Sequence, residues 1–273
     1  VEHEPARLRR NTVAIDHEGF DLVLWGGTAA RAKLPGVVTA EASFYHLGER
    51  DRAGRPTRDR SLDTYGGRLL RDPGSGRVDG EVEAYRQSGS IAASAVAGSA
   101  RVPVSAWFLH AAAGYTLPGA MKARLSLRYD RASGDHAGGR YGRFDTLFGM
   151  RRGDFAPSGL YNAVARTNLS TPSVRLEVAP SRRWDAFATY NALWLAARTD
   201  AFATTGVRDA SGRAGAFAGH QIDGRVRWWA RPERLLVEFD GVMLAKGRFL
   251  KEAPNAPAGG TTIYGSFNVT ASF

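Results

Sequence analysis

Thr-Thr-Ile-Tyr-Gly-Ser-Phe-Asn-Val-Thr-Ala-Ser-Phe, from Thr261 to Phe273, is the stretch that decides the fold of this chain. Its odd-numbered positions are apolar or small, and its even-numbered positions are polar or amphipathic. A period of two that persists this long is typical of a β-strand with one apolar and one wet face. Such a strand can face the core of a soluble sandwich, or it can face lipid and a watery lumen in a transmembrane barrel. The stretch alone does not separate these two alternatives.

Composition narrows the class of protein. The chain has 273 residues, is 43% hydrophobic and contains no cysteine. It has no run of eighteen apolar residues, which excludes a transmembrane helix. Its negative mean hydropathy does not exclude a barrel, because only half of each barrel strand needs to be apolar. The polar start at Val1-Glu2-His3-Glu4 lacks the apolar region of a signal peptide, so we expect either a trimmed chain or a protein that is not exported.

The chain is strongly basic. Its formal net charge is +10, and four of its 37 basic residues are lysine, so that 33 are arginine. These arginines are scattered through strands and turns with no basic helix and no known binding motif, so we expect no nucleic-acid partner. A basic surface or lumen that handles an anionic solute or lipopolysaccharide fits this distribution better.

The alternation of the last stretch recurs along the whole chain, and no helical period of 3.6 persists anywhere. A further short strand is possible at Asn11–Asp16. The predicted strands are Phe20–Ala30, Val37–His46, Asp63–Arg71, Val78–Gly89, Val104–Leu117, Met121–Ala132, Pro172–Ala179, Trp184–Ala197, His220–Ala230, Leu235–Phe249 and Thr261–Phe273.

From Lys33 onward, short and long connections between these strands alternate without exception. A soluble sandwich has no reason to sort its loops in this way, whereas a transmembrane barrel has short periplasmic turns and long extracellular loops. Aromatic residues also gather near strand ends, as a membrane-interface girdle requires. They are Tyr115, Trp184, Trp194, Trp228, Trp229 and Phe249.

We therefore predict an all-β protein, an antiparallel transmembrane β-barrel in the outer membrane of a Gram-negative bacterium. Residues 20–273 would form the barrel, and residues 1–19 would lead into it. The strand count is eleven, or twelve with Asn11–Asp16. Twelve would close a small barrel, and eleven would mean that strands before Val1 are missing, because single-chain bacterial barrels have even counts.

Several segments carry a family resemblance. Together they are similar to the alginate-export family of outer-membrane porins, whose pattern reads AW…GY, then LRYDYASGD, then a loop with FDPLF. Arg131 stands here in place of the usual Tyr, and Thr146 in place of Pro. The matching segments are Ala106-Trp107 with Gly114-Tyr115, Leu127 to Asp135, Phe144 to Phe148, Asn168-Leu169, Trp194 to Ala196 and Thr199 to Ala201, preceded by Tyr65 to Leu69 and Val82 to Tyr85.

The resemblance covers about residues 63–273 and implies an eighteen-stranded barrel that passes an anionic polysaccharide such as alginate, or other small anionic solutes. The chain is too short for eighteen strands, so an N-terminal portion is expected to be missing from it. The expected partners are the anionic saccharide or solute, outer-membrane lipid and lipopolysaccharide, periplasmic export proteins and such a missing N-terminal half. No cofactor is expected.

Alternation also predicts which charged side chains face the lumen. They could act as an arginine ladder for a carboxylated sugar, because guanidinium matches carboxylate. They could equally be wall residues that neutralise one another, as Arg175 with Glu177 and Asp223 with Arg225 suggest. The predicted pore-lining residues are Arg68, Arg124, Arg128, Asp130, Arg175, Arg225, Arg227, Lys246 and Arg248.

The long loop 133–171 either folds into the pore as a constriction or lies outside in solvent. In the first case its candidate pore residues are Phe144, Asp145, Phe148, Arg151 and Arg152. Aspartates in this loop do not have the spacing of a calcium-binding EF-hand, so we expect no metal site.

Two other classes of function fit a small barrel. A membrane esterase or protease would need a nucleophile paired with a histidine at a strand end. Of the six histidines, His110 is mid-strand with no obvious Ser or acid nearby in sequence, so we interpret it as a wall residue. A purely structural or adhesive barrel is the third class. Ion conductance, compared with ester or peptide hydrolysis, would discriminate the three.

Overall fold

The computed structural model of the chain describes residues 19–51, 56–149, 155–157 and 160–273. The possible strand Asn11–Asp16 and the loop residues Arg151 and Arg152 lie outside these ranges. Within them, one antiparallel sheet is formed in which each strand pairs with the next along the sequence. Its strands are β1 Leu22–Leu34, β2 Val38–Glu49, β3 Ser61–Arg71, β4 Val78–Ala92, β5 Arg101–Thr116, β6 Arg124–Ala132, β7 Leu169–Ser181, β8 Trp184–Trp194, β9 Phe217–Arg231, β10 Leu235–Lys246 and β11 Thr261–Ala271.

The pairing register places polar side chains on one face of the sheet. His110 of β5, for example, lies opposite Glu83 of β4 on one side and Asp130 of β6 on the other. The opposite face is largely apolar and open to the surroundings, and Leu125 and Leu127 of β6 are 53% and 61% exposed. No second sheet covers this apolar face within the described residues. The soluble-sandwich alternative is therefore wrong, because it requires a second layer over the apolar side chains.

The apolar face has the dimensions of a membrane belt. On β8, Trp184 and Trp194 both point to this face, near the two ends of the strand. Ten residues at about 3.3 Å each separate them by about 33 Å along the strand, and a tilt of about 40° reduces this to about 25 Å across the membrane. That height matches the apolar band of outer-membrane barrels. The all-β antiparallel fold with a lipid-facing belt is thus confirmed.

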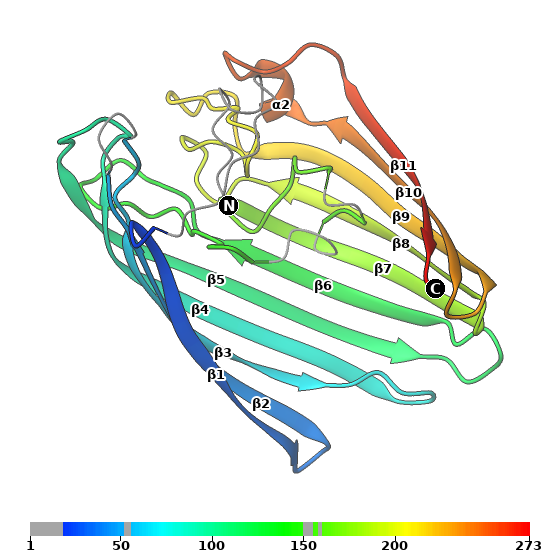
Figure 1. Ribbon diagram of the computed structural model, residues 1–273. Coiled ribbons are helices and arrows are strands. Elements are labelled where there is room, and N and C mark those ends of the chain that lie inside the picture. Colours follow the sequence, from blue (N-terminus) through cyan, green and yellow to red (C-terminus); the bar gives the residue numbers. More distant parts are fainter. Residues whose placement is uncertain (1–18, 52–55, 150–154, 158–159) are drawn as a thin grey trace.

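Short and long connections lie at opposite ends of the sheet, as the sequence predicts. Short turns join β1 to β2, β3 to β4, β5 to β6, β7 to β8 and β9 to β10, and longer loops join the remaining pairs (Figure 1). In Figure 1 the short turns lie along the lower right of the molecule and the longer loops at the upper left and top. Two of these turns are tight enough that Lys122 and Glu233 adopt positive φ angles of 46° and 64°.

The end of one predicted strand is a helix instead. The predicted strand Leu235–Phe249 stops at Lys246, and a short helix, α2 Arg248–Glu252, follows it. The ring of Phe249 is fully buried in a cluster with residues of the long loops, so it is not part of an aromatic girdle. Burial of Phe249 and Leu250 outweighs the alternation that would continue the strand.

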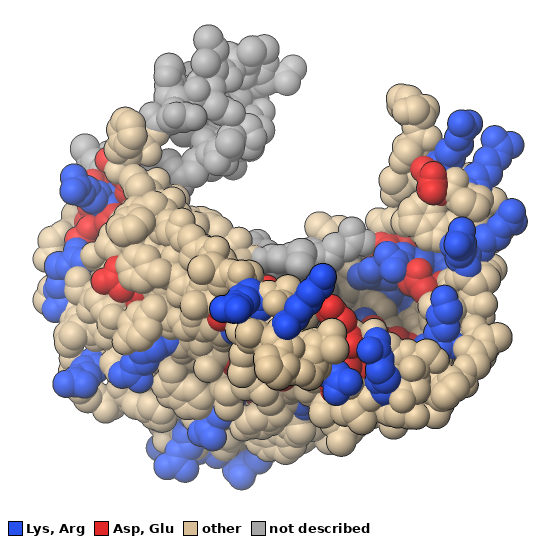
Figure 2. Space-filling model, turned by 90° about the horizontal axis from the view of Figure 1, so that it is seen from below, with Lys and Arg blue, Asp and Glu red and all other residues tan. Residues whose placement is uncertain are grey.

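The sheet curls into a trough rather than a closed cylinder (Figures 1 and 2). β1 and β11 are its two edges, and they are not paired with each other. The polar face lines the inside of the trough. Buried apolar residues gather at the long-loop end, where loops pack against the inner face around Phe202 and Phe249 in one cluster and around Leu62 and Phe108 in another. Among the described residues, no helix has the length and apolar character needed to cross a membrane.

Candidate functional site

The inner face of the trough carries the charged residues that alternation predicts for a lumen. The register runs across the sheet without interruption from Glu41 through Arg68, Glu83, His110 and Asp130. The predicted pore-lining residues on this face are Arg68, Arg124, Arg128, Asp130, Arg175, Arg225, Arg227 and Lys246. Arg248 differs from them: it lies on α2, is 63% exposed and forms an ion pair with Glu252 at 2.8 Å.

Most of these basic side chains are bound to carboxylates of neighbouring strands. Such pairs satisfy the charges of a wet wall and leave little free charge for a solute. The predicted pair of Arg175 with Glu177 is present, whereas Asp223 bonds to Asn191 and not to Arg225. The pairs are Arg68 with Glu41 (2.9 Å) and Glu81 (3.2 Å), Arg124 with Asp79 (3.0 Å) and Glu177, Arg175 with Glu177 (3.1 Å), Arg225 with Asp240 (3.3 Å) and Glu238 (3.5 Å), and Arg227 with Asp185 (2.8 Å).

The local sequence makes room for one of these pairs. Gly114 of β5 lies opposite Ser126 of β6, beside the side chain of Arg124. A Cβ at Gly114 would lie 2.6 Å from an Nη atom of Arg124, so a larger residue would displace the guanidinium from this position. The glycine therefore lets the guanidinium lie flat against the wall between Asp79 and Glu177.

Arg128 is different from its neighbours. It lies on the inner face in the middle of the sheet, between Ala112 of β5 and Ser173 of β7, and it is half-buried. It has no hydrogen bond and no ion pair in the described part of the chain. Lys246 is used in another way, because its Nζ donates to the carbonyls of Pro257 and Ala258 at 2.9 and 3.0 Å and holds the loop before β11.

His110 and Asp130 form a buried pair that the sequence did not indicate. The imidazole Nδ1 lies 2.8 Å from the Asp130 carboxylate, and Arg166 of the long loop approaches the same carboxylate at 3.1 Å. The two residues are adjacent only across the β5–β6 ladder, twenty positions apart in sequence. No serine hydroxyl is hydrogen-bonded to His110 among the described residues.

The described part of the loop between β6 and β7 lies inside the trough (Figure 1). At one side, Gln87 of β4 exchanges two hydrogen bonds with the backbone of Asp145, at 3.0 and 3.1 Å. Arg60 binds the Asp145 carboxylate at 2.8 Å, and its hydrogen bond with Glu49 raises the pKa of its guanidinium, so it remains charged. The loop is therefore fixed to the β3–β4 side of the wall.

The other side of the same loop is held by β9. Gln221 donates to the carbonyl of Phe155 and accepts a hydrogen bond from the Tyr161 hydroxyl at 3.1 Å. Burial raises the pKa of the Tyr161 phenol, so it stays a donor. Arg225 donates to the carbonyl of Pro157 at 3.0 Å. Since β4 and β9 are on opposite sides of the trough, the loop crosses its interior.

The candidate constriction residues have different positions within this loop. Phe144 is buried and stacks on Phe108 of β5, with ring centroids 5.6 Å apart, so it anchors the loop. Asp145 is the ion-pair partner of Arg60. Phe148 is 58% exposed and lines a cavity of about 470 Å³ between the loop and the β1–β5 wall.

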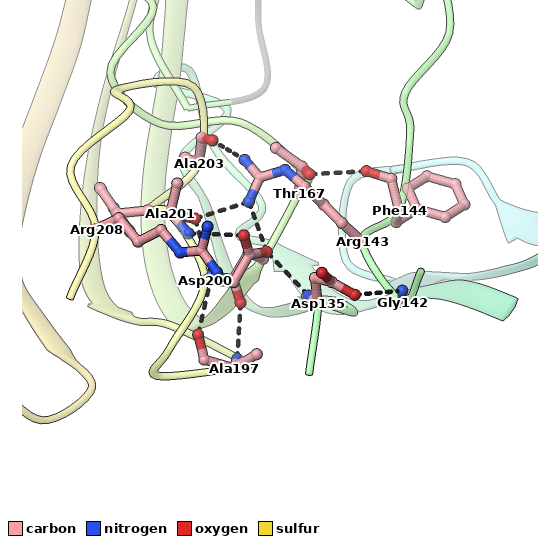
Figure 3. Close-up of polar contacts among 12 residues, drawn as sticks. Asp135, Gly142, Arg143, Phe144, Thr167, Ala197, Asp200, Ala201, Ala203 and Arg208 are labelled. Carbon is pink, nitrogen blue, oxygen red and sulfur yellow. Dashed lines mark hydrogen bonds and ion pairs between the residues drawn. The ribbon is translucent and has the colours of Figure 1, made fainter. Parts of the chain in front are cut away.

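A second group of contacts ties this loop to the loop between β8 and β9 (Figure 3). Arg143 donates to the carboxylate of Asp200 at 2.8 Å, to the carbonyl of Ala201 at 2.7 Å and to the carbonyl of Ala203. The Asp200 carboxylate also accepts the backbone N–H of Asp135 at 2.9 Å. We name Arg143 and Asp200 the loop latch. Sequence reasoning did not assign it, although Thr199 to Ala201 was one of the family-like segments.

Asn168 supports the latch just before β7. Its side-chain amide donates to the carbonyls of Ala197 and Ala201 at 3.1 and 2.9 Å and accepts the N–H of Ala197 at 2.7 Å. Asn168 has a positive φ of 45°, a conformation that asparagine tolerates well. Gly134 leaves the space for it, because a Cβ there would collide with the amide oxygen. The latch lies beside a cavity of about 760 Å³ at the long-loop end, lined by Arg58, Arg140 and Arg208 among others.

Comparison with known proteins agrees with this geometry. A family model described as alginate export matches residues 23–262, which is well over half of the chain. A search of curated proteins finds no match.

Proposed function

The chain belongs to the alginate-export family, and from this premise we propose that its sheet lines an outer-membrane channel through which anionic oligo- or polysaccharide diffuses passively. Membership of this family supports a function as a channel for alginate export. The polar trough, the apolar belt and the loop that crosses the interior are the features of the chain that support it.

The proposal that the solute is an anion depends on Arg128. The wall as a whole is not a positive surface, because carboxylates outnumber basic side chains on the inner strand faces and pair with most of them. A free guanidinium among neutralised pairs is the place where a carboxylate can bind without breaking an existing contact. Arg128 faces the trough with no such contact in the described residues. We therefore propose Arg128 as the residue that meets the carboxylates of a passing uronic sugar.

The loop between β6 and β7 would set the width of the path. It is anchored on both sides of the trough, so it would narrow the lumen without closing it, with Phe148 on its exposed surface. Arg151 and Arg152 lie outside the described residues, and their place in the constriction stays a prediction.

A channel also needs a closed wall. Every backbone N–H and C=O in hydrocarbon needs a hydrogen-bond partner, so the free edges of β1 and β11 have to be paired in the membrane. We propose that further strands pair with these edges, as the eighteen-stranded barrel implied by the family resemblance requires. Lipopolysaccharide and periplasmic export proteins remain proposed partners.

The test is the reversal potential of the reconstituted protein under a salt gradient, followed by addition of alginate oligomers. We expect anion selectivity, and a reduced current with the uronic oligomers but not with a neutral oligosaccharide of the same length. Cation selectivity would contradict the proposal. Hydrolysis of esters or peptides without conductance would favour the enzyme alternative instead.

A further inference from the structure

Basic side chains gather on three adjacent short turns. The turns are neighbours, because Ala179 of β7 donates to the carbonyl of Met121 at 2.9 Å and Trp229 of β9 donates to the carbonyl of Arg183 at 2.8 Å. Glu233 is the acidic residue among them. We define the turn patch by its exposed basic side chains, which are Lys122, Arg182, Arg183, Arg231 and Arg234.

The charges of the turn patch are not neutralised within the described residues. None of its five side chains forms an ion pair in the described part of the chain, whereas at the long-loop end Arg60 and Arg143 are bound to carboxylates. Five like charges on adjoining turns repel one another in the absence of counter-ions. The patch is therefore an exposed, positively charged surface that can bind an anion from outside the chain.

Two indole rings show what kind of anion fits. Trp184 and Trp228 stack on the outer face with centroids 5.7 Å apart, and they are 45% and 40% exposed. They directly adjoin the turn patch, since Trp184 follows Arg183. Further along the strands the same face continues with Leu176 and Val226, which are 48% and 43% exposed. Exposed indoles between an apolar belt and a polar rim belong at the level of lipid headgroups.

We propose that the turn patch and the Trp184–Trp228 pair bind the phosphate headgroup of an anionic phospholipid in the leaflet on the short-turn side. The guanidinium groups match the phosphate oxygens, and the indoles and Leu176 lie where the glycerol and acyl chains of the same lipid would pass. A soluble polyanion would contact the arginines but would leave the outward-facing indoles uncovered. This favours a lipid over the channel solute, and the site is independent of the lumen.

The experiment measures lipid binding to the whole protein in detergent by native mass spectrometry. Phosphatidylglycerol is titrated against phosphatidylcholine of the same acyl chains. The triple variant Arg182→Gln/Arg183→Gln/Arg231→Gln is compared with a charge-matched triple at the other end, Arg140→Gln/Arg213→Gln/Lys251→Gln. We expect the parent protein to prefer phosphatidylglycerol, and the turn triple to lose roughly a hundredfold in affinity, at about fivefold for each of its three basic residues. The control triple should bind like the parent.

Three results would overturn the proposal. The first is a parent protein that binds the two lipids equally, a measurement that needs no variant to fold. The second is an equal loss in both triples, which would indicate a general charge effect. The third is displacement of phosphatidylglycerol by alginate oligomers or inorganic phosphate at similar charge concentration, which would indicate a general polyanion site.

Discussion

Replacing Arg128 with glutamine removes an inner-face guanidinium that has no hydrogen bond or ion pair in the described residues, while replacing Arg124 removes one that is paired with two carboxylates. A unit charge about 4 Å from a passing carboxylate contributes about 1 kcal/mol in water, which is about a fivefold change in the anion's occupancy. The same charge lowers the occupancy of a cation at this position. Arg128→Gln should therefore lower the anion-to-cation permeability ratio at least fivefold at low salt, and less at 1 M salt, where the Debye length falls to about 3 Å.

The free energy of unfolding should fall more for Arg124→Gln than for Arg128→Gln, the reverse of their order in selectivity. Asp79 is 2% exposed and depends on Arg124, so Arg124→Gln leaves a buried carboxylate without its cation and should cost about 3–5 kcal/mol of the free energy of unfolding. Arg128→Gln breaks no hydrogen bond or ion pair and removes only longer-range charge interactions with Asp130 and Asp223, so it should cost less than Arg124→Gln. Urea unfolding in detergent measures these costs, and planar-bilayer reversal potentials measure selectivity, with Arg248→Gln on α2 as the exposed control. An unchanged reversal potential in a folded Arg128→Gln channel would refute the role of this side chain.

Three further predictions concern the loops. Arg143→Gln should expose the β6–β7 and β8–β9 loops to limited proteolysis and cost about 3–5 kcal/mol, because Asp200 would lose its cation; retained protease resistance would show that the latch is dispensable. Phe144→Ala should destabilise the protein by about 3–5 kcal/mol through a cavity, whereas Phe148→Ala should leave stability nearly unchanged and alter single-channel conductance; equal destabilisation would contradict their assigned positions. Hydrogen bonds from the backbone of Ala214 and from Ser211 lower the pKa of Asp209 below its ordinary value of 3.8. The stabilisation by these hydrogen bonds is therefore complete above pH 3.8 and is lost as the pH falls through the lowered pKa. Amide hydrogen exchange at Ala214 should accelerate only in that acidic range, and acceleration near neutral pH would contradict this role of Asp209.

Some site residues could be placed from the sequence because a strand repeats every two residues. Alternation alone put Asp130 and Arg175 on the inner face, and the register agrees. The same rule misplaced Arg248, because alternation does not indicate where a strand ends when the next residues can bury Phe249. It also could not separate Arg124 from Arg128, which have the same parity on one strand.

Pairing partners depend on contacts that are remote in sequence. The ion pair of Arg124 with Asp79 joins residues 45 positions apart, and the hydrogen bonds of Arg143 reach residues 57 to 60 positions away. No local pattern marks such pairs, because each depends on strand register and on the path of a loop. For the same reason the sequence left open whether loop 133–171 enters the trough, and the contacts of Gln87 and Gln221 answered it.

The sequence by itself determined the strands, their two faces and the order of short and long connections, because these follow from a two-residue period and from turn residues that act locally. Only the tertiary structure decided which charges are neutralised and which remain free. A charge is neutralised when strands distant in sequence bring a carboxylate within about 4 Å of it, and that distance is set by the packing of the whole sheet and its loops.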